Sequence, residues 1–142
     1  MIEIRRSAIV RRTAGRMFDL VNDVEAYPRR FTWCVGARVL EREADSLVAR
    51  LELSIGGMRQ AFTTRNTLAP PQRIGMQLVE GPFRELRGAW TFAALGEDGC
   101  KIALALDFDY SGRLMAPVMR VGFEKLADRM VDEFCREAER EP

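Results

Sequence analysis

The sequence of 142 residues contains no histidine. Histidine is the usual general base near neutral pH and a frequent zinc ligand, so its absence excludes Ser-His-Asp and Cys-His catalysis and His-ligated zinc. Cysteine is also scarce: Cys34, Cys100 and Cys135 are odd in number, far apart and without a Cys-x-x-Cys pair. This pattern favours reduced thiols in a cytoplasmic protein over disulfides.

Long apolar runs are missing as well. No stretch approaches the roughly eighteen apolar residues of a membrane span, and the opening Met-Ile-Glu-Ile-Arg-Arg lacks the apolar centre of a signal peptide. With 47% hydrophobic and 30% charged residues, we expect a single domain over residues 1–142. Its apolar material suffices for a core, or for a core and a cavity.

Lysine is rare, because twenty of the 22 basic residues are arginine, and the net charge of +1 is unevenly distributed. Residues 1–71 carry a net charge of +4, whereas residues 72–142 carry −3. Seven arginines fall in the first thirty residues: Arg5, Arg6, Arg11, Arg12, Arg16, Arg29 and Arg30. They form either a basic surface for RNA phosphates or lipid head groups, or an ordinary solvated surface, and the sequence leaves both open.

The segment 113–140 carries the longest periodic pattern. Large apolar residues recur every three or four positions, as expected for a helix that buries one face: Met115, Met119, Phe123, Leu126, Met130 and Phe134. Ser111 can cap this helix, and Pro117 either begins its regular part or bends it. Residues 114–123 are apolar nearly all round, so we expect this half to be covered on most sides.

The rest of the chain predicts a curved sheet. Residues 2–10 alternate like a strand, Thr13 can cap a short helix to about Asn22, and a second helical turn should end at Pro28. Period-two patterns then predict six strands at 35–40, 47–55, 58–68, 74–78, 86–94 and 102–110. Gly56-Gly57 is typical of a hairpin turn. This order predicts an α+β fold: about seven antiparallel strands curved around the long C-terminal helix, with two short helices after the first strand.

Few side chains offer chemistry. Asp107 and Asp109 share the strand face opposite Ile102 and its apolar companions, so we expect them to face water rather than to act as an acid/base pair. Cys34 has no visible base and is expected to be a structural thiol. Arg65 is predicted to point inward, either in an ion pair with Glu85 or Asp23 or as a polar anchor for a ligand; both remain open.

Methionines and aromatic residues are numerous enough to surround one space. Such side chains form either plain core or the lining of a cavity for a long, apolar, partly planar ligand. The candidates are Met58, Met76, Met115, Met119, Met130, Phe62, Phe83, Trp90, Phe92 and Phe123.

Several separated motifs resemble one known family. The run Phe18-Asp19-Leu20-Val21-Asn22-Asp23-Val24-Glu25-Ala26-Tyr27-Pro28, followed by Trp33-Cys34, is similar to the N-terminal signature of coenzyme Q-binding proteins of the START (polyketide cyclase-like) superfamily. Bacterial members of this family include the ribosome association toxin RatA. Phe62-Thr63-Thr64-Arg65-Asn66 and Gly81-Pro82-Phe83 extend the resemblance along the chain. One departure is Arg29-Arg30-Phe31-Thr32, where the family has an acidic residue, two apolar residues and a proline.

The resemblance implies a helix-grip fold with a cavity between sheet and helix. It implies non-catalytic binding of ubiquinone or a related isoprenoid lipid, in support of respiration, with no other cofactor. The alternative is a RatA-like toxin that binds the large ribosomal subunit and blocks subunit association. A polyketide cyclase or aromatase is a third, less favoured class.

The expected partners are a hydrophobic small molecule, the ribosome and the inner membrane as a peripheral contact, but not DNA. We expect the portal near residues 27–33 and 81–83, where aromatic side chains can sit at a membrane surface. The candidate ligand-binding residues are Tyr27, Phe31, Trp33, Phe62, Arg65, Met76, Phe83, Trp90, Phe92, Met115, Met119 and Phe123.

Overall fold

The computed structural model describes residues 1–110 and 116–140. Its elements follow the predicted order: β1 (Ile2–Val10), α1 (Ala14–Asn22), the 3-10 turn η1 (Val24–Ala26), α2 (Tyr27–Arg30), β2 (Cys34–Arg42), β3 (Ser46–Ile55), β4 (Met58–Ala69), β5 (Arg73–Glu80), β6 (Glu85–Leu95), β7 (Gly99–Asp109) and α3 (Pro117–Arg140).

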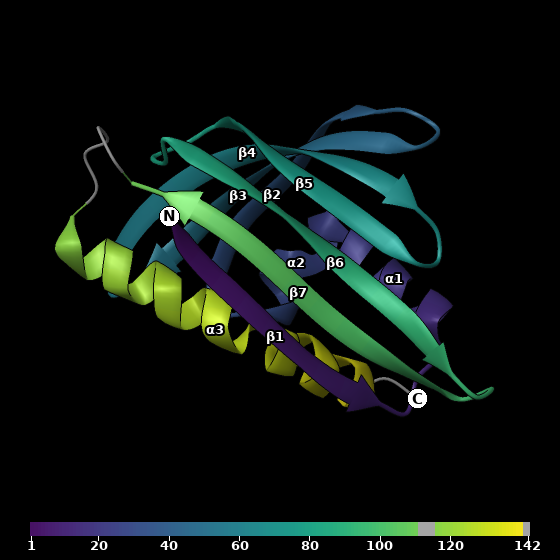
Figure 1. Cartoon of the computed structure of the whole chain (residues 1–142). Helices are drawn as coiled ribbons and strands as arrows, with labels where there is room; N and C mark the ends of the chain where they lie inside the picture. The colour runs from purple at the N-terminus through teal and green to yellow at the C-terminus, as the bar shows by residue number, and fades with distance from the viewer. Residues whose placement is uncertain (111–115, 141–142) are drawn as a thin grey trace.

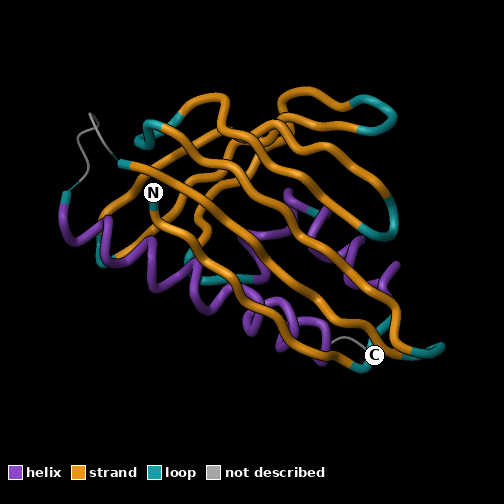
Figure 2. Tube along the Cα trace, in the orientation of Figure 1, coloured by secondary structure: helices purple, strands orange, loops and turns teal. Residues whose placement is uncertain are grey.

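The seven strands form one antiparallel sheet in the order β1-β7-β6-β5-β4-β3-β2. Strands β2 to β7 are neighbours in both sequence and space, which is why short turns suffice to join them. The sheet curves, and α3 lies on its concave side beside β1 (Figure 1). Figure 2 shows the strands arching over the helices. The predicted helix-grip architecture is therefore confirmed.

Local sequence explains the tightest turn. Gly56 and Gly57 join β3 to β4 and have φ angles of +57° and +80°. Two consecutive positive φ angles are what a two-residue hairpin turn requires, and glycine adopts them without steric penalty. The turn sets the register of β3 against β4, which places alternate side chains of both strands on the inner face.

Thr13 begins α1 as predicted, because its side-chain oxygen accepts a hydrogen bond from the backbone N–H of Arg16 at 3.1 Å. Replacing Thr13 with alanine is expected to lower the free energy of unfolding by about 1 kcal/mol, since one N–H of the first turn loses its partner. Urea titration followed by tryptophan fluorescence measures this loss. Thr13→Ser keeps the acceptor and should remain close to wild type; an equal loss in both variants contradicts the capping role.

Two expectations about prolines and coverage need correction. Pro28 does not end a helical turn but lies in the first turn of α2, where its missing N–H has no intrahelical partner to lose. Of the two alternatives for Pro117, the structure shows the first: α3 begins there. The front of α3 is not covered on most sides, because Val118 and Val121 are 51% and 53% exposed. Ser111 and Met115 lie outside the described residues.

The core between sheet and α3 contains two groups of aromatic rings. In one, Phe134 of α3 is fully buried and contacts Tyr27, Phe31 and Trp90, with ring centroids 5.4, 4.8 and 5.2 Å away. In the other, Phe123 contacts Phe83 and Phe108 at 4.9 and 5.2 Å, and also Phe62. Members of both groups border the internal cavity.

Candidate functional site

A cavity of about 80 Å³ lies between the concave face of the sheet and α3. Seven of the predicted residues line it: Tyr27, Trp33, Phe62, Met76, Trp90, Phe123 and Met130. The sequence patterns did not point to most of the remaining lining residues, which include Leu51, Leu53, Thr64, Asn66, Ala127 and Phe134. Most of these residues are ordinary members of strand or helix patterns, and nothing in their spacing distinguishes a cavity from a filled core.

Two polar side chains of β4 face this apolar space. Thr64 and Asn66 are 7% and 8% exposed, and the Thr64 hydroxyl donates a hydrogen bond to the Asn66 side-chain oxygen at 2.8 Å. That bond occupies the Asn66 oxygen, and the Asn66 amide nitrogen donates no hydrogen bond to any described residue. The indole N–H of Trp33 is also buried without a partner among the described residues. The cavity thus has mostly apolar walls, and its lining residues include a polar pair on β4 and a tryptophan whose buried N–H has no partner among the described residues.

Tyr27 is the only titratable side chain among the described lining residues, and the fold already uses its hydroxyl group. The hydroxyl donates a hydrogen bond to the backbone carbonyl of Val21. Burial, followed by the nearby Cys34 and Asp23, raises the pKa of Tyr27 far above its usual value. Tyr27 therefore stays protonated and supplies no general base at neutral pH.

Four predicted residues lie in the core but not around the cavity: Phe31, Phe83, Phe92 and Met119. Phe31 stacks on Trp33 at 4.9 Å, and Phe83 stacks on Tyr110 at 5.7 Å. Their rings are 5% and 1% exposed, so the expectation that aromatic side chains of residues 27–33 and 81–83 reach a membrane surface is wrong for both. Met58, by contrast, is 39% exposed and lines no internal space.

The prediction for Arg65 is wrong. Thr64 and Asn66 point into the cavity, so Arg65 between them points to the outer face of the sheet, the face turned away from α3. Its guanidinium lies 3.8 Å from Glu41, and the two side chains are 52% and 66% exposed. Arg65 therefore pairs with neither Glu85 nor Asp23 and cannot anchor a ligand in the cavity.

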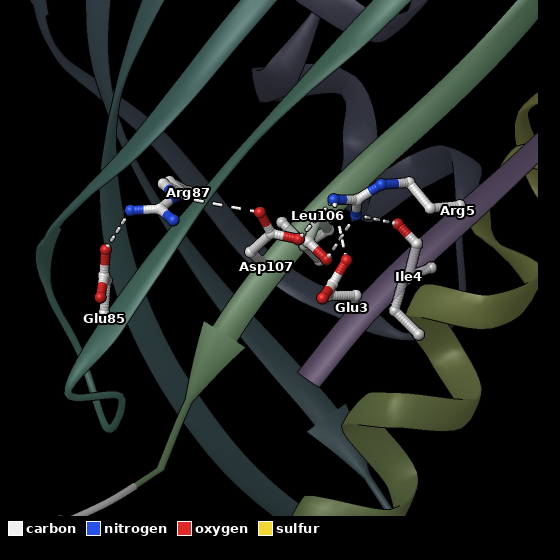
Figure 3. Close-up of polar contacts among 7 residues, drawn as sticks. All are labelled: Glu3, Ile4, Arg5, Glu85, Arg87, Leu106 and Asp107. Carbon is white, nitrogen blue, oxygen red and sulfur yellow. Dashed lines mark hydrogen bonds and ion pairs between the residues drawn. The ribbon is translucent and has the colours of Figure 1, made fainter. Parts of the chain in front are cut away.

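A row of alternating charges crosses the outer face (Figure 3). Asp107 of β7 lies 2.8 Å from the guanidinium of Arg5 and 3.9 Å from that of Arg87, and these arginines also pair with Glu3 and Glu85. The expectation that Asp107 faces away from the interior is confirmed. Because the row is largely exposed, each pair contributes little to stability.

Several arginines of the first thirty residues are engaged by other parts of the fold. Arg6, next to the outward-facing Arg5, pairs with Asp128 of α3. Arg30 pairs with Glu137 at 3.4 Å, and Arg12 donates to the carbonyl of Ala138 at 3.2 Å. These side chains therefore join β1, the segment after it and α2 to α3, and acidic partners offset the charges of Arg6 and Arg30.

All three cysteines behave as structural thiols. Burial raises the pKa of Cys34 and of Cys100, and burial together with Asp132, Cys100 and Glu139 raises the pKa of Cys135 to about 11. Since the thiolate is the reactive form, we expect the native protein to react with an aromatic disulfide reagent at pH 8 far more slowly than the urea-unfolded protein. Cys135, which is partly exposed, should react faster as the pH rises toward 11. Rapid labelling of native protein at pH 8 contradicts this.

Residues 1–110 and 116–140 offer neither a metal site nor a membrane-spanning helix. No group of three potential metal ligands occurs in this part of the chain. No helix in the same ranges is long and apolar enough to cross a membrane.

The curved sheet, the long C-terminal helix and the cavity between them define a helix-grip domain of the START type. The chain belongs to the family described as "Polyketide cyclase / dehydrase and lipid transport", whose sequence profile matches residues 10–135. It is 47% identical over 135 residues to "Ribosome association toxin RatA" of Pseudomonas aeruginosa, covering 95% of this chain and 94% of that protein. It is 40% identical over 134 residues to "Persistence and stress-resistance toxin PasT" of Escherichia coli O6:H1, covering 94% and 85%.

A solved structure supports the fold. The Zhui aromatase/cyclase from Streptomyces sp. R1128 superimposes with a TM-score of 0.84 at 20% identity, covering 98% of this chain and 94% of that one. At this identity, the likeness concerns the fold alone.

Proposed function

We propose that this protein acts on the ribosome, by binding the large subunit and blocking its association with the small subunit. The observation that carries the proposal is the full-length 47% identity to a protein named ribosome association toxin. The match covers 95% of this chain and 94% of that protein, so it is a comparison of whole domains.

The cavity supports a non-enzymatic function. Among the described residues that line it, none is Asp, Glu, Lys or Arg, and Tyr27 is held protonated by burial. Proton transfer to a polyketide needs a group that can change its protonation near the working pH, and the cavity offers none from these residues. A cyclase function is therefore not favoured.

A subunit association assay tests the proposal. Purified large and small subunits are mixed with increasing amounts of the protein at a magnesium concentration that permits association, and the particles are separated on a sucrose gradient. We expect the fraction of associated particles to fall, and the protein to sediment with the large subunit. An unrelated protein of matched size and charge serves as the control. Unchanged association at a molar excess of the protein rejects the proposal.

A second candidate function is the binding of a small apolar ligand such as ubiquinone. The observation that favours it is the mostly apolar lining, which includes Trp33, whose buried indole N–H has no partner among the described residues, and the inward-facing Asn66. A buried donor without a partner costs free energy, which a carbonyl oxygen of a quinone ring would recover by accepting its hydrogen bond. The cavity of about 80 Å³ is smaller than the roughly 150 Å³ of an engineered cavity that binds benzene. An isoprenoid quinone therefore requires α3 to move outward.

Filling the cavity separates the two functions. Ala127 of α3 is buried against the cavity, so Ala127→Leu should occupy the space without removing a donor. Delipidated wild-type protein is titrated with a short-tail ubiquinone and followed by tryptophan fluorescence. We expect quenching in the wild type and in the exposed-site control Ala93→Leu, but not in Ala127→Leu, while all three act equally on subunit association. No quenching in the wild type rejects the ligand function alone.

A further inference from the structure

The outer face of the sheet carries a groove that the internal cavity does not account for. This outer groove has a volume of about 560 Å³ and is bordered by Arg65 of β4, Arg73 of β5 and Arg87 of β6. Its floor consists of Gly75, Ala89 and Ala105, which are cross-strand partners in a single row across β5, β6 and β7. Because these adjacent residues are small, the longer side chains on either side of them project further from the sheet and form the sides of the groove.

The arginines surround this floor. A Cβ atom on Gly75 would lie 2.8 Å from Nη1 of Arg73, so the Arg73 side chain extends over Gly75 within the groove. Gln77 lies between Arg65 and Arg87 as the cross-strand partner of both. Because neighbouring strands are about 4.8 Å apart, the backbones of Arg65 and Arg87 are separated by about 10 Å. Three guanidinium groups therefore approach one trough from three strands.

The positive charges of Arg65 and Arg73 are largely available. Among the described residues, Arg73 forms no hydrogen bond or ion pair. Arg65 has only the exposed partner Glu41 at 3.8 Å, a contact of negligible strength. Asp107 is the one carboxylate among the described groove residues, and Arg5 lies 2.8 Å from it (Figure 3). Arg87 is engaged outside the groove by Glu85 at 2.6 Å, so the available positive charge comes from Arg65 and Arg73.

We propose that the outer groove binds the phosphodiester backbone of an RNA strand. The inference rests on the proposed function and names the surface by which the protein would contact the large subunit. Guanidinium groups bind phosphate in a bidentate manner, while Gln77 and Thr67 supply further donors beside the floor. Because Gly75, Ala89 and Ala105 have small side chains or none, the sugar-phosphate backbone of the RNA can approach the sheet closely.

The lining favours RNA over a lipid surface. Insertion into a membrane interface requires exposed large apolar side chains, and Met76, the only large apolar residue among the described lining residues, is half-buried. The sheet hydrogen bonds across the floor are already formed, so recognition comes from side chains and charge. Binding of this type is independent of base sequence and depends strongly on salt.

The test uses two pairs of variants of the full chain. Arg65→Gln with Arg73→Gln removes two groove charges, whereas Arg59→Gln with Arg129→Gln removes two exposed charges elsewhere. Ala89→Leu fills the floor without a change of charge, and Ala93→Leu adds the same bulk to an exposed position on the same strand, outside the groove. The probe is fluorescein-labelled oligouridylate, with anionic phospholipid vesicles and polyglutamate as comparison probes.

We expect wild-type protein and both controls to bind the oligonucleotide alike. The double groove variant should bind roughly tenfold more weakly, and its slope of log affinity against log salt should fall by about 1.4 for two lost phosphate contacts. Ala89→Leu should also weaken RNA binding, but its slope of log affinity against log salt should change less than that of the double variant, because no charge is lost. The groove variants should lose large-subunit co-sedimentation in parallel.

The outcomes separate this inference from the proposed function. Wild-type and groove variants that co-sediment equally well with the large subunit overturn the groove and leave the ribosomal function standing. Groove-dependent RNA binding without any effect on ribosomal particles rejects the ribosomal function and supports the groove. Groove-dependent binding to vesicles or polyglutamate but not to oligouridylate overturns the inference.

Discussion

Replacing Phe134 with alanine is expected to lower the free energy of unfolding by about 3 to 5 kcal/mol. Phe134 is fully buried, and its ring contacts Tyr27, Phe31 and Trp90. Truncation removes the buried apolar area and three ring contacts at once. Because Phe134 also lines the cavity, the vacated volume joins the existing 80 Å³.

Urea unfolding followed by circular dichroism measures this loss, and Phe134→Leu provides the graded control, with a smaller decrease expected. The enlarged cavity gives a second readout that a mere loss of stability would not give. Toluene, which binds the native state only, should raise the melting temperature of Phe134→Ala and leave the wild type nearly unchanged. A toluene response of equal size in both proteins contradicts this account of the cavity.

Much of the fold follows from residue patterns. The alternation from Ile102 to Tyr110 and the stripe from Met119 to Phe134 each bury one face, and that leaves few ways to combine a curved sheet with one long helix. The antiparallel order was predictable because short turns, such as Gly56-Gly57, admit only neighbouring strands. Burial periodicity therefore specified the architecture and which face of each element is inside.

The site was harder to predict, because periodicity gives a face but not its packing. Strand β4 is polar on both faces, and its alternation alone did not show that Thr64 and Asn66, rather than Arg65, point inward. Phe62 lines the cavity and Phe92 does not, although both face inward; the difference depends on neighbouring side chains in three dimensions.

The outer groove was missed for a different reason. Arg65, Arg73 and Arg87 are eight and fourteen residues apart, whereas the arginines of the first thirty residues are concentrated in sequence. Strand pairing brings these three separated arginines together at the outer groove. It turns Arg5 and Arg6 to opposite faces of β1, because successive side chains of a strand alternate. Clustering of arginines in the sequence therefore does not predict where they cluster on the surface of a folded sheet.

The second large effect is expected at Gly88, where the backbones of β6 and β7 come unusually close. A Cβ atom on Gly88 would lie 2.3 Å from the carbonyl oxygen of Ala105 and 3.1 Å from the Cα atom of Leu106. Both are backbone atoms of β7, so no side-chain rotation can relieve the overlap. The two strands must separate or flatten, which disturbs the curvature that closes the sheet over α3.

Gly88→Ala is therefore expected to lower the free energy of unfolding by about 3 kcal/mol or more, a large effect for a single added methyl group. Gly36→Ala is the matched control: it lies in β2, and its Cβ atom would meet only the Cβ of Glu52 at 3.5 Å, an ordinary contact. This control should match wild type or gain up to about 1 kcal/mol. If the two variants unfold at the same urea concentration, the close approach of β6 and β7 is contradicted. A Gly88→Ala protein that fails to fold, while Gly36→Ala folds normally, is the extreme form of the expected result.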